Sequence, residues 1–191
     1  MGSSDKAGNR GLPATPRDGT AVELAGLCYS VISWLSKLDR SVYPFDAVTK
    51  QDERLTFADW SGKIRDNFER HFFVDQDDSN PLVNQRDIYK DTLNASEPWR
   101  DFQLRCNFVV SMAVAPEIFD GEHARKALDV YETRLVSVLG IRTLDPSDWN
   151  YNGNYDNSND SDDFKTAHGY NYHNGPGKMK EWKALKIEAR A

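Results

Sequence analysis

The stretch from Gly140 to Pro176 combines aromatic rings with polar side chains in a way that suits a sugar ligand. Asn, Asp, Gly and His fill the space between its rings. Amide and carboxylate side chains need water or a polar ligand, so this segment cannot bury itself in a core. A sugar has apolar ring faces and hydroxyl groups around its rim, which match flat rings beside polar side chains. We therefore expect a ligand-facing loop, with a decorated surface loop as the alternative. The rings are Trp149, Tyr151, Tyr155, Tyr170 and Tyr172.

Long loops without secondary structure are usually functional or disordered, and disordered segments contain few aromatic residues. The strongest binding candidates in this loop are Asn171, Tyr172 and His173, together with Tyr155. Tyr172 can stack on a sugar ring, while Asn171 and His173 can hold hydroxyl groups. For His173 the alternative is a structural hydrogen bond.

A dense acidic run also lies in this loop. Calcium is conceivable there, but the spacing does not fit an EF-hand loop, so we expect a solvated acidic segment and no bound metal. The run consists of Asp156, Asp160, Asp162 and Asp163.

Composition restricts the classes of protein. The 191 residues suit one domain or part of a larger one, and 39% are apolar, enough for a core. The net charge of −6 argues against a nucleic-acid partner, because phosphate binding needs excess Lys and Arg. Cys28 and Cys106 lack metal or redox spacing and are expected to be reduced, buried thiols. No apolar run reaches membrane-spanning length and no apolar signal region begins the chain, so we expect a cytoplasmic protein without a membrane partner.

Two helices are predicted in the first half of the chain. Residues 21–38 show helical spacing of apolar positions, with Thr20 as a capping residue. A second helix starts near Thr56, with Asp59 in a loose capping box. Its aromatic stripe is expected to face the core. The apolar positions are Val22, Leu24, Leu27, Val31, Trp34, Leu35 and Leu38 in the first helix, and Trp60, Ile64, Phe68 and Phe72 in the second.

Further helices are predicted after a long loop over residues 75–100. A short one, buried on all sides, runs from a cap at Asn107 to Ala115. The next runs from residue 121 or 122 to Leu139 and ends at Gly140 as its C′ glycine. A Lys-rich tail, residues 178–191, can form one more helix. We find no strand pattern, and the predicted fold is all-α, with about five helices joined by long polar loops.

Several blocks of the chain resemble, in order, the C-terminal part of eukaryotic glycogen debranching enzymes. That part is the amylo-α-1,6-glucosidase domain, an (α/α)6 toroid. The resemblance runs from Gly2 to about Pro176, so residues 1–176 are interpreted as a partial toroid and 177–191 as a divergent Lys-rich tail. Cys106 stands where the family usually has Pro. The blocks are Asn9–Gly19, Ile88–Asp91, Leu104–Phe108, Ala115–Glu117 and Gly140–Pro176, including Gly169–His173.

The resemblance implies hydrolysis of the α-1,6-linked glucose at branch points of glycogen or another branched α-glucan. It implies an inverting mechanism without metal or organic cofactor, in which two carboxyl groups stand roughly 6.5–9.5 Å apart. The family's acid would precede Met1, and its base would follow the block that ends at Pro176. No catalytic residue is therefore expected within the chain. Nothing here resembles the glucanotransferase domain that family members also carry.

Four more residues are candidates for binding substrate. Arg17 and Asp18 follow a rigid segment with two prolines and either line the sugar cleft or form an Arg–Asp pair that fixes a turn. Arg105 and Asn107 open the short helix, where they can donate hydrogen bonds to hydroxyl groups; otherwise Asn107 is simply a helix cap.

Three hypotheses follow from this resemblance. The chain is a piece of a glucosidase that is inactive alone, a glycan-binding remnant, or the product of a truncated gene. Residues Gly177-Lys178 replace the family's Glu, as an unspliced intron would produce. Because the chain supplies only part of a toroid, we expect it to be marginally stable or prone to aggregation when isolated.

Overall fold

A computed structural model describes residues 6, 8, 16–138 and 140–151, which divide into two compact units. The first unit contains residues up to Arg17, Gln103–Cys106 and the residues from Tyr131 onward; the second contains Asp18–Phe102 and Asn107–Val130. The elements are β1 (Thr20–Ala21), α1 (Val22–Lys37), β2 (Ala47–Lys50), β3 (Glu53–Thr56), α2 (Phe57–Phe72), β4 (Phe73–Val74), β5 (Ile88–Tyr89), β6 (Thr92–Leu93), η1 (Pro98–Phe102), α3 (Phe108–Val114), η2 (Pro116–Ile118), α4 (Gly121–Leu135), β7 (Val136–Ser137) and β8 (Gly140–Ile141).

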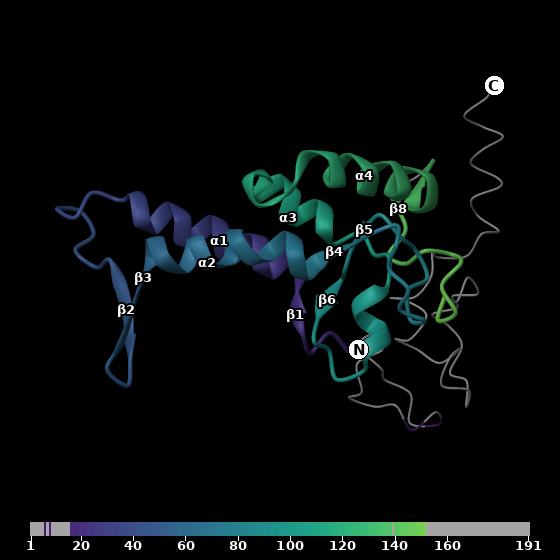
Figure 1. Ribbon diagram of the computed structural model, residues 1–191, viewed down its shortest axis with the longest axis horizontal. Helices are drawn as coiled ribbons and strands as arrows, with labels where there is room; N and C mark the ends of the chain where they lie inside the picture. The colour runs from purple at the N-terminus through teal and green to yellow at the C-terminus, as the bar shows by residue number, and fades with distance from the viewer. Residues whose placement is uncertain (1–5, 7, 9–15, 139, 152–191) are drawn as a thin grey trace. The chain divides into compact units, whose positions relative to one another are not determined.

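Helix α1 organises the second unit by packing against both α2 and α3. Figure 1 shows α1 and α2 side by side along their length. A Cβ atom at Gly26 would lie 2.0 Å from the Ser111 hydroxyl oxygen and 2.8 Å from the Ser111 Cα. Glycine is therefore required at this position for α1 and α3 to approach so closely.

The helical spacing of apolar residues in α1 does not separate its buried side from its exposed side. Its buried residues are Val22, Gly26, Tyr29, Ile32 and Ser33. Of the apolar positions that predicted this helix, Val22 is buried, whereas Leu24, Leu27, Val31 and Trp34 are exposed. Thr20 does not cap the helix either: it lies in β1, Ala21 is the N-cap residue, and no side chain caps the helix.

Helix α2 starts as predicted, because the Thr56 hydroxyl accepts a hydrogen bond from the Asp59 backbone N–H at 3.0 Å. Phe68 and Phe72 are buried, which confirms this half of the aromatic stripe, while Trp60 and Ile64 are only half-buried. The Phe68 and Phe72 rings stack 4.7 Å apart. A ring cluster around them forms the core of this unit, with Tyr89, Phe73, Phe108 and Phe119 as further members.

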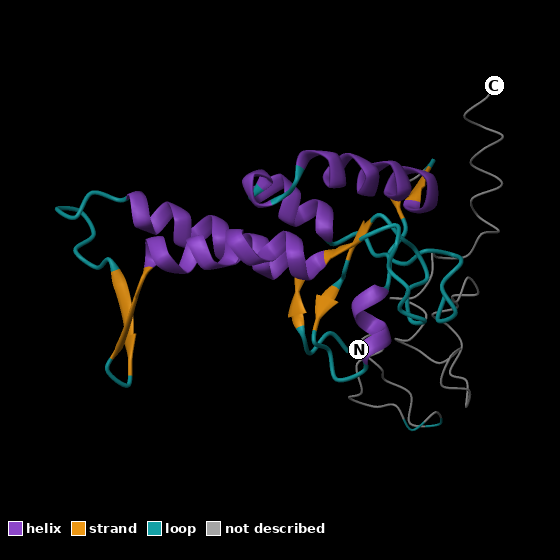
Figure 2. Ribbon diagram, in the orientation of Figure 1, coloured by secondary structure: helices purple, strands orange, loops and turns teal. Residues whose placement is uncertain are grey.

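The expectation that no strands form is wrong, as Figure 2 shows. The described residues contain four two-stranded antiparallel pairs, β1 with β6, β2 with β3, β4 with β5, and β7 with β8. Three of these strands and the 3-10 helix η1 lie within residues 73–102, mostly in the region predicted to be one long loop. The strands are two to four residues long, and the helices still predominate. The fold is therefore α-rich, with short β pairs.

The β2–β3 hairpin joins α1 to α2 and has a two-residue turn. Both turn residues have positive φ, 50° for Gln51 and 69° for Asp52, as in the turns that match the twist of a hairpin. Lys50 pairs with Glu53, and the ladder ends where Ala47 pairs with Thr56. Thr56 is thus both the last residue of β3 and the cap of α2.

Two other helix predictions need correction. Helix α4 ends at Leu135 rather than Leu139, and Gly140, with φ of 135°, lies in β8 instead of closing the helix. Helix α3 is not buried on all sides, because Val110 is exposed while Phe108 and Ser111 are buried. Cys28 and Cys106 are free, as expected, but half-buried. The tail predicted as a helix, residues 178–191, lies outside the described residues.

Candidate functional site

The segment from Leu144 to Tyr151, in the first unit, folds into tight turns held by two aspartates. The Asp145 carboxylate accepts hydrogen bonds from Ser147, at 3.0 Å from the backbone N–H and 2.7 Å from the hydroxyl. Asp148 repeats the pattern by accepting the Asn150 backbone N–H at 2.7 Å. Both carboxyl groups belong to buried residues. Aspartate stabilises such turns by bonding backbone groups two residues on.

A second segment, Gln103–Cys106, lies against these turns. The Leu104 carbonyl accepts the Asp145 backbone N–H at 3.1 Å. The side-chain oxygen of Gln103, Oε1, accepts two N–H groups of Arg105, at 3.1 Å from Nε and 2.7 Å from Nη2. Its amide nitrogen donates to Asp148 at 3.3 Å. Gln103 therefore links a guanidinium group to a carboxyl group, all three belonging to buried residues.

Burial raises the pKa of Asp148, although hydrogen bonds from Asn150 and Gln103 and the charge of Arg105 act in the opposite direction. A carboxyl group in this environment holds its proton more tightly than one in water. The cluster of Gln103, Arg105 and Asp148 thus combines N–H donors, an amide and a carboxyl group. Such groups are the complements of sugar hydroxyls.

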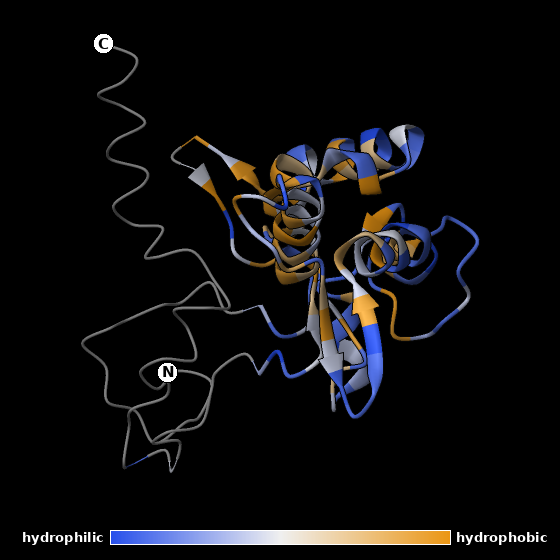
Figure 3. Cartoon of the chain, turned by 90° about the vertical axis from the view of Figure 1, so that its left-hand side faces the viewer, coloured by the Kyte–Doolittle hydropathy of each residue, from blue (hydrophilic) through white to orange (hydrophobic). Residues whose placement is uncertain are grey.

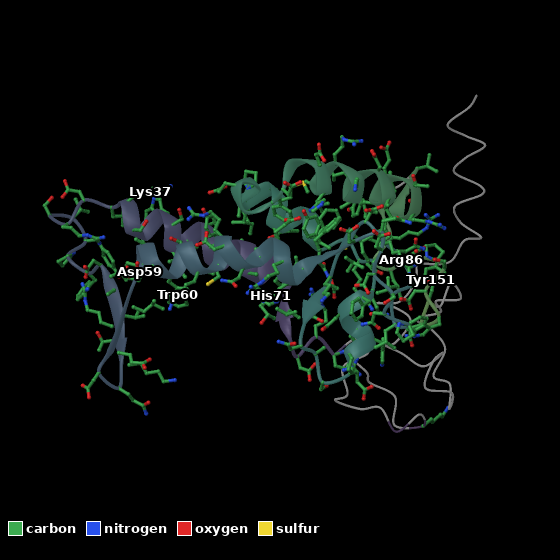
Figure 4. All side chains as sticks on the ribbon, viewed as in Figure 1. Lys37, Asp59, Trp60, His71, Arg86 and Tyr151 are labelled. Carbon is green, nitrogen blue, oxygen red and sulfur yellow. The ribbon has the colours of Figure 1, made fainter. Side chains whose placement is uncertain are left out.

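Aromatic side chains lie beside this cluster in the same unit. Trp149 follows Asp148 directly and is 54% exposed. Tyr151, labelled in Figure 4, is half-buried, its backbone N–H bonds to the Asp148 carbonyl at 2.9 Å, and burial raises its pKa. An exposed indole next to a polar cluster can stack on the apolar face of a sugar ring.

Two of the predicted binding residues, Arg105 and Asn107, have defined partners. Arg105 is only 6% exposed, and besides Gln103 it donates to the Thr143 carbonyl at 3.4 Å. The Asn107 side chain donates to Asp91 at 2.7 Å and makes no capping bond to α3. Asn107 is therefore the N-cap residue of α3 by position, but its side chain does not cap the helix.

Arg17 and Asp18 directly precede β1 along the chain. Arg17 is half-buried, and Asp18 is exposed. Asp18 accepts the Ser96 backbone N–H at 3.1 Å, and the Ser96 side chain and backbone lower its pKa. This contact ties the start of the second unit to the loop after β6. The other predicted binding residues, Tyr155, Asn171, Tyr172 and His173, lie outside the described residues.

Sequence reasoning missed Gln103 and Asp148. Asp148 belongs to the polar-aromatic stretch that was singled out, but nothing in its spacing marked it as buried. Gln103 lies two residues before Arg105, and alternate side chains share a face wherever a chain is extended. This spacing of two residues was the one feature of the sequence that could have linked Gln103 to Arg105.

A second polar cluster, in the second unit, centres on Glu69. Its carboxylate accepts the Tyr89 hydroxyl at 3.0 Å, the Asp120 backbone N–H at 3.1 Å and lies 2.7 Å from Nδ1 of His123. The His123 ring also stacks on Phe73, with centroids 3.9 Å apart. Burial raises the pKa of Tyr89, and the nearby Glu69 charge adds to this effect. The contacts hold the end of α2 to the start of α4, a structural role.

The second unit also has a small open cavity of about 160 Å3. Its surface is apolar, and it contains none of the predicted binding residues. Apolar walls suit a hydrocarbon group better than a sugar. The lining residues are Thr20, Ala25, Ile64, Asn67, Phe68, His71, Phe72 and Leu93, of which His71 is labelled in Figure 4.

The described residues contain neither a group placed to hold a metal ion nor a helix that could cross a membrane. Within residues 16–138 and 140–151, no group of three or more His, Cys, Asp or Glu side chains is placed to hold a metal ion. Over the same part of the chain, every helix is too short or too polar to cross a bilayer.

Comparison with known proteins identifies the family. Residues 2–184 match the family described as amylo-alpha-1,6-glucosidase. The chain is also 44% identical, over 193 aligned residues, to glycogen debranching enzyme of Saccharomyces cerevisiae. That alignment covers 95% of the chain but only 12% of the yeast protein. The match spans nearly all of the sequence, and this chain therefore belongs to the amylo-alpha-1,6-glucosidase family.

Proposed function

We propose that this chain forms part of a glucosidase domain that removes α-1,6-linked glucose from branch points of glycogen. The observation that carries the proposal is the family match over residues 2–184, supported by the name of the yeast relative. The domain is a toroid of paired helices, of which this chain supplies a part, and the enzyme acts in the cytoplasm. The acid and the base of an inverting reaction come from sequence beyond the matched region.

Within this proposal, the cluster of Gln103, Arg105 and Asp148 binds the sugar's hydroxyl groups. Gln103 fixes the guanidinium group of Arg105 through two hydrogen bonds, so the group is oriented before substrate arrives. Preorganised groups lose less conformational entropy on binding than mobile ones. Trp149 stacks on the ring, as its exposed indole allows. Arg17, Asp18, Asn107, Tyr155, Asn171, Tyr172 and His173 stay predicted substrate-binding residues.

The test is glucose release from a 6-O-α-glucosyl maltooligosaccharide. The isolated chain is expected to release none. A chimera, in which this chain replaces the matching segment of the yeast relative, is expected to release glucose. Arg105→Lys should lower that rate, because a lysine lacks the forked donors held by Gln103. Arg54→Lys is the control, since Arg54 is exposed and pairs with Asp46 in the β2–β3 region. Glucose release by the isolated chain, or equal rates for both variants, would contradict the proposal.

One observation supports a second function, glycan binding without catalysis. The exposed Trp149 ring beside a polar cluster is an arrangement that can hold a sugar even where no reaction follows. In that case the isolated chain is retained on immobilised glycogen, and Trp149→Ala abolishes the retention. Trp34→Ala, which removes an equally exposed indole from α1, leaves it unchanged. A chain that neither binds glycogen nor restores activity to the chimera would fit a truncated gene product.

A further inference from the structure

Asp101, in η1, is a buried carboxylate that binds the short loop before it in the chain. Aspartate is strongly hydrophilic, at the blue end of the scale in Figure 3, yet Asp101 is only 8% exposed. Its carboxylate accepts the Thr92 hydroxyl at 2.6 Å and the backbone N–H groups of Asn94 and Ala95 at 2.9 and 3.1 Å. Its backbone carbonyl accepts the Asp91 N–H at 2.9 Å. Because a buried charge needs hydrogen bonds to be tolerated, these contacts fix the loop and the carboxylate together.

The loop of residues 91–96 holds a predicted substrate-binding residue at each of its ends. At its start, the Asp91 carboxylate accepts the Asn107 side-chain N–H at 2.7 Å, and Asp91 is only 3% exposed. At its end, the Ser96 backbone N–H donates to the Asp18 carboxylate at 3.1 Å. Asp18 and Asn107 are far apart in the sequence, but both are bonded to this one loop.

The chain that follows Asp18 is tied to the 91–96 loop by its backbone as well. Strand β1 pairs with β6, which lies within the loop. A Cβ atom at Gly19 would lie 2.5 Å from the Leu93 carbonyl oxygen, so only glycine allows this approach. The Val22 N–H also donates to a carbonyl group of the loop, at 3.0 Å. A shift of the loop would therefore move the neighbouring backbone with it.

We propose that Asp101 is a positioning residue for substrate binding, which acts through the 91–96 loop to set the places of Asp18 and Asn107. Residues that bind a substrate must be held to within about 0.5 Å by the groups behind them, and a buried, hydrogen-bonded carboxylate can supply such support. This inference rests on the proposed function, which makes Asp18 and Asn107 substrate-binding residues.

The test is glucose release by the chimera with the yeast relative, with Asp101→Asn as the variant. One oxygen becomes an amide nitrogen that cannot accept a hydrogen bond, so the loop loses at least one anchor. We expect kcat/KM to fall at least about fivefold. Glu69→Gln is the matched control, because that carboxylate also accepts a hydroxyl and a backbone N–H, but from Tyr89 and Asp120. It should change kcat/KM by less than about twofold.

A comparison of two backgrounds separates positioning from a general structural role. In a chimera that already carries Asp18→Ala and Asn107→Ala, Asp101 has no binding residue left to position. Asp101→Asn should then lower kcat/KM by less than about twofold. The same fold-change in both backgrounds would overturn the inference. Thr92→Val removes only one bond to the Asp101 carboxylate and should show the same dependence on background, with a smaller loss, should Asp101→Asn fail to fold.

Hydrogen exchange of single backbone amides in the same chimera tests the inference without any activity. Asp101→Asn should speed exchange at Val22 and Ser96, which join the loop to the chain around Asp18, and Glu69→Gln should not. Faster exchange confined to Asn94 and Ala95 would show that Asp101 holds only its own loop, and would overturn the inference.

The two measurements fail in different ways. An unaltered chimera that releases no glucose would contradict the proposed function, and exchange at Val22 and Ser96 would then still decide whether Asp101 positions the chain around Asp18. Normal glucose release, with kcat/KM unchanged by Asp101→Asn, would overturn the inference and leave the proposed function intact.

Discussion

Replacing Gln103 by Met should destabilise the chain strongly, although the side chain's volume hardly changes. The side-chain oxygen of Gln103 accepts hydrogen bonds from both Nε and Nη2 of Arg105, at 3.1 and 2.7 Å. Its amide nitrogen donates to Asp148 at 3.3 Å. A methionine sulfur is a weak acceptor and no donor, so the variant loses all three contacts.

The magnitude follows from the number and kind of these contacts. A hydrogen bond to a charged group contributes about 1.5–3 kcal/mol. Two bonds from one guanidinium group to one oxygen add less than twice that amount, and the 3.3 Å bond to Asp148 is long. We therefore expect a loss of about 2–4 kcal/mol in the free energy of unfolding. That loss is a large share of the roughly 5–15 kcal/mol that stabilises a typical domain.

Urea denaturation followed by tryptophan fluorescence measures this loss by linear extrapolation. Gln76→Met is the matched control, because Gln76 is exposed and should tolerate the same change. The reasoning would be refuted if Gln103→Met stayed within about 0.5 kcal/mol of that control. Such a result would mean that the link between Arg105 and Asp148 contributes nothing to stability.

Three further results are expected. The isolated chain should unfold broadly below about 50 °C in a thermal melt; a sharp cooperative transition above that temperature would contradict its marginal stability. Ser111→Ala should raise the free energy of unfolding by about 0.5–2 kcal/mol, because the buried Ser111 hydroxyl has no partner. Ser61→Ala, whose hydroxyl bonds to Ala58, should give no gain in the same urea titrations. Because burial raises the pKa of Asp148 above its usual 3.8, the folded state holds that proton more tightly, and wild-type stability should fall as pH rises from about 4. Asp148→Asn should remove this part of the pH dependence. If the free energies of unfolding of the two proteins differed by a constant amount from pH 4 to pH 7, the raised pKa of Asp148 would be contradicted.

The sequence was sufficient to predict the helices in the second unit, but not which faces they bury. The start of α2 was predicted because Thr56 and Asp59 form a local signal that needs no tertiary contact. The inner face of α1 could not be predicted, because apolar residues surround the helix and the period selects no side. Gly26 and Ser33 are among the residues that face inward, and small or polar residues carry little weight in such a pattern.

The strands were missed because they are too short to show an alternating pattern. Pairs such as Phe73–Val74 with Ile88–Tyr89 depend on contacts distant in sequence. Gly140 was interpreted as the end of a helix because a glycine often follows one. Instead the chain leaves α4 at Leu135 and returns through β7 and β8. Strand pairing decided these positions, distant in sequence for β4 with β5 and local for β7 with β8.

The candidate site was predicted in part. Arg105 was named mainly because its block resembles the family, and the structure surrounds it with polar partners. Gln103 and Asp148 were not named, because their burial results from the turns at Asp145 and Asp148 meeting a segment some 40 residues earlier. No local pattern encodes that meeting.

The register of the β2–β3 hairpin determines which residue caps the first turn of α2. Its two-residue turn fixes which residues oppose each other, and the last of them, Thr56, supplies the hydroxyl that starts the helix. If the strands slipped by one residue, each side chain would move to the opposite face of the ribbon. Thr56 would then turn away from the Asp59 N–H, and the helix would lose its starting point. The length of this peripheral turn is therefore constrained by the helix behind it, even though Gln51 and Asp52 are themselves exposed.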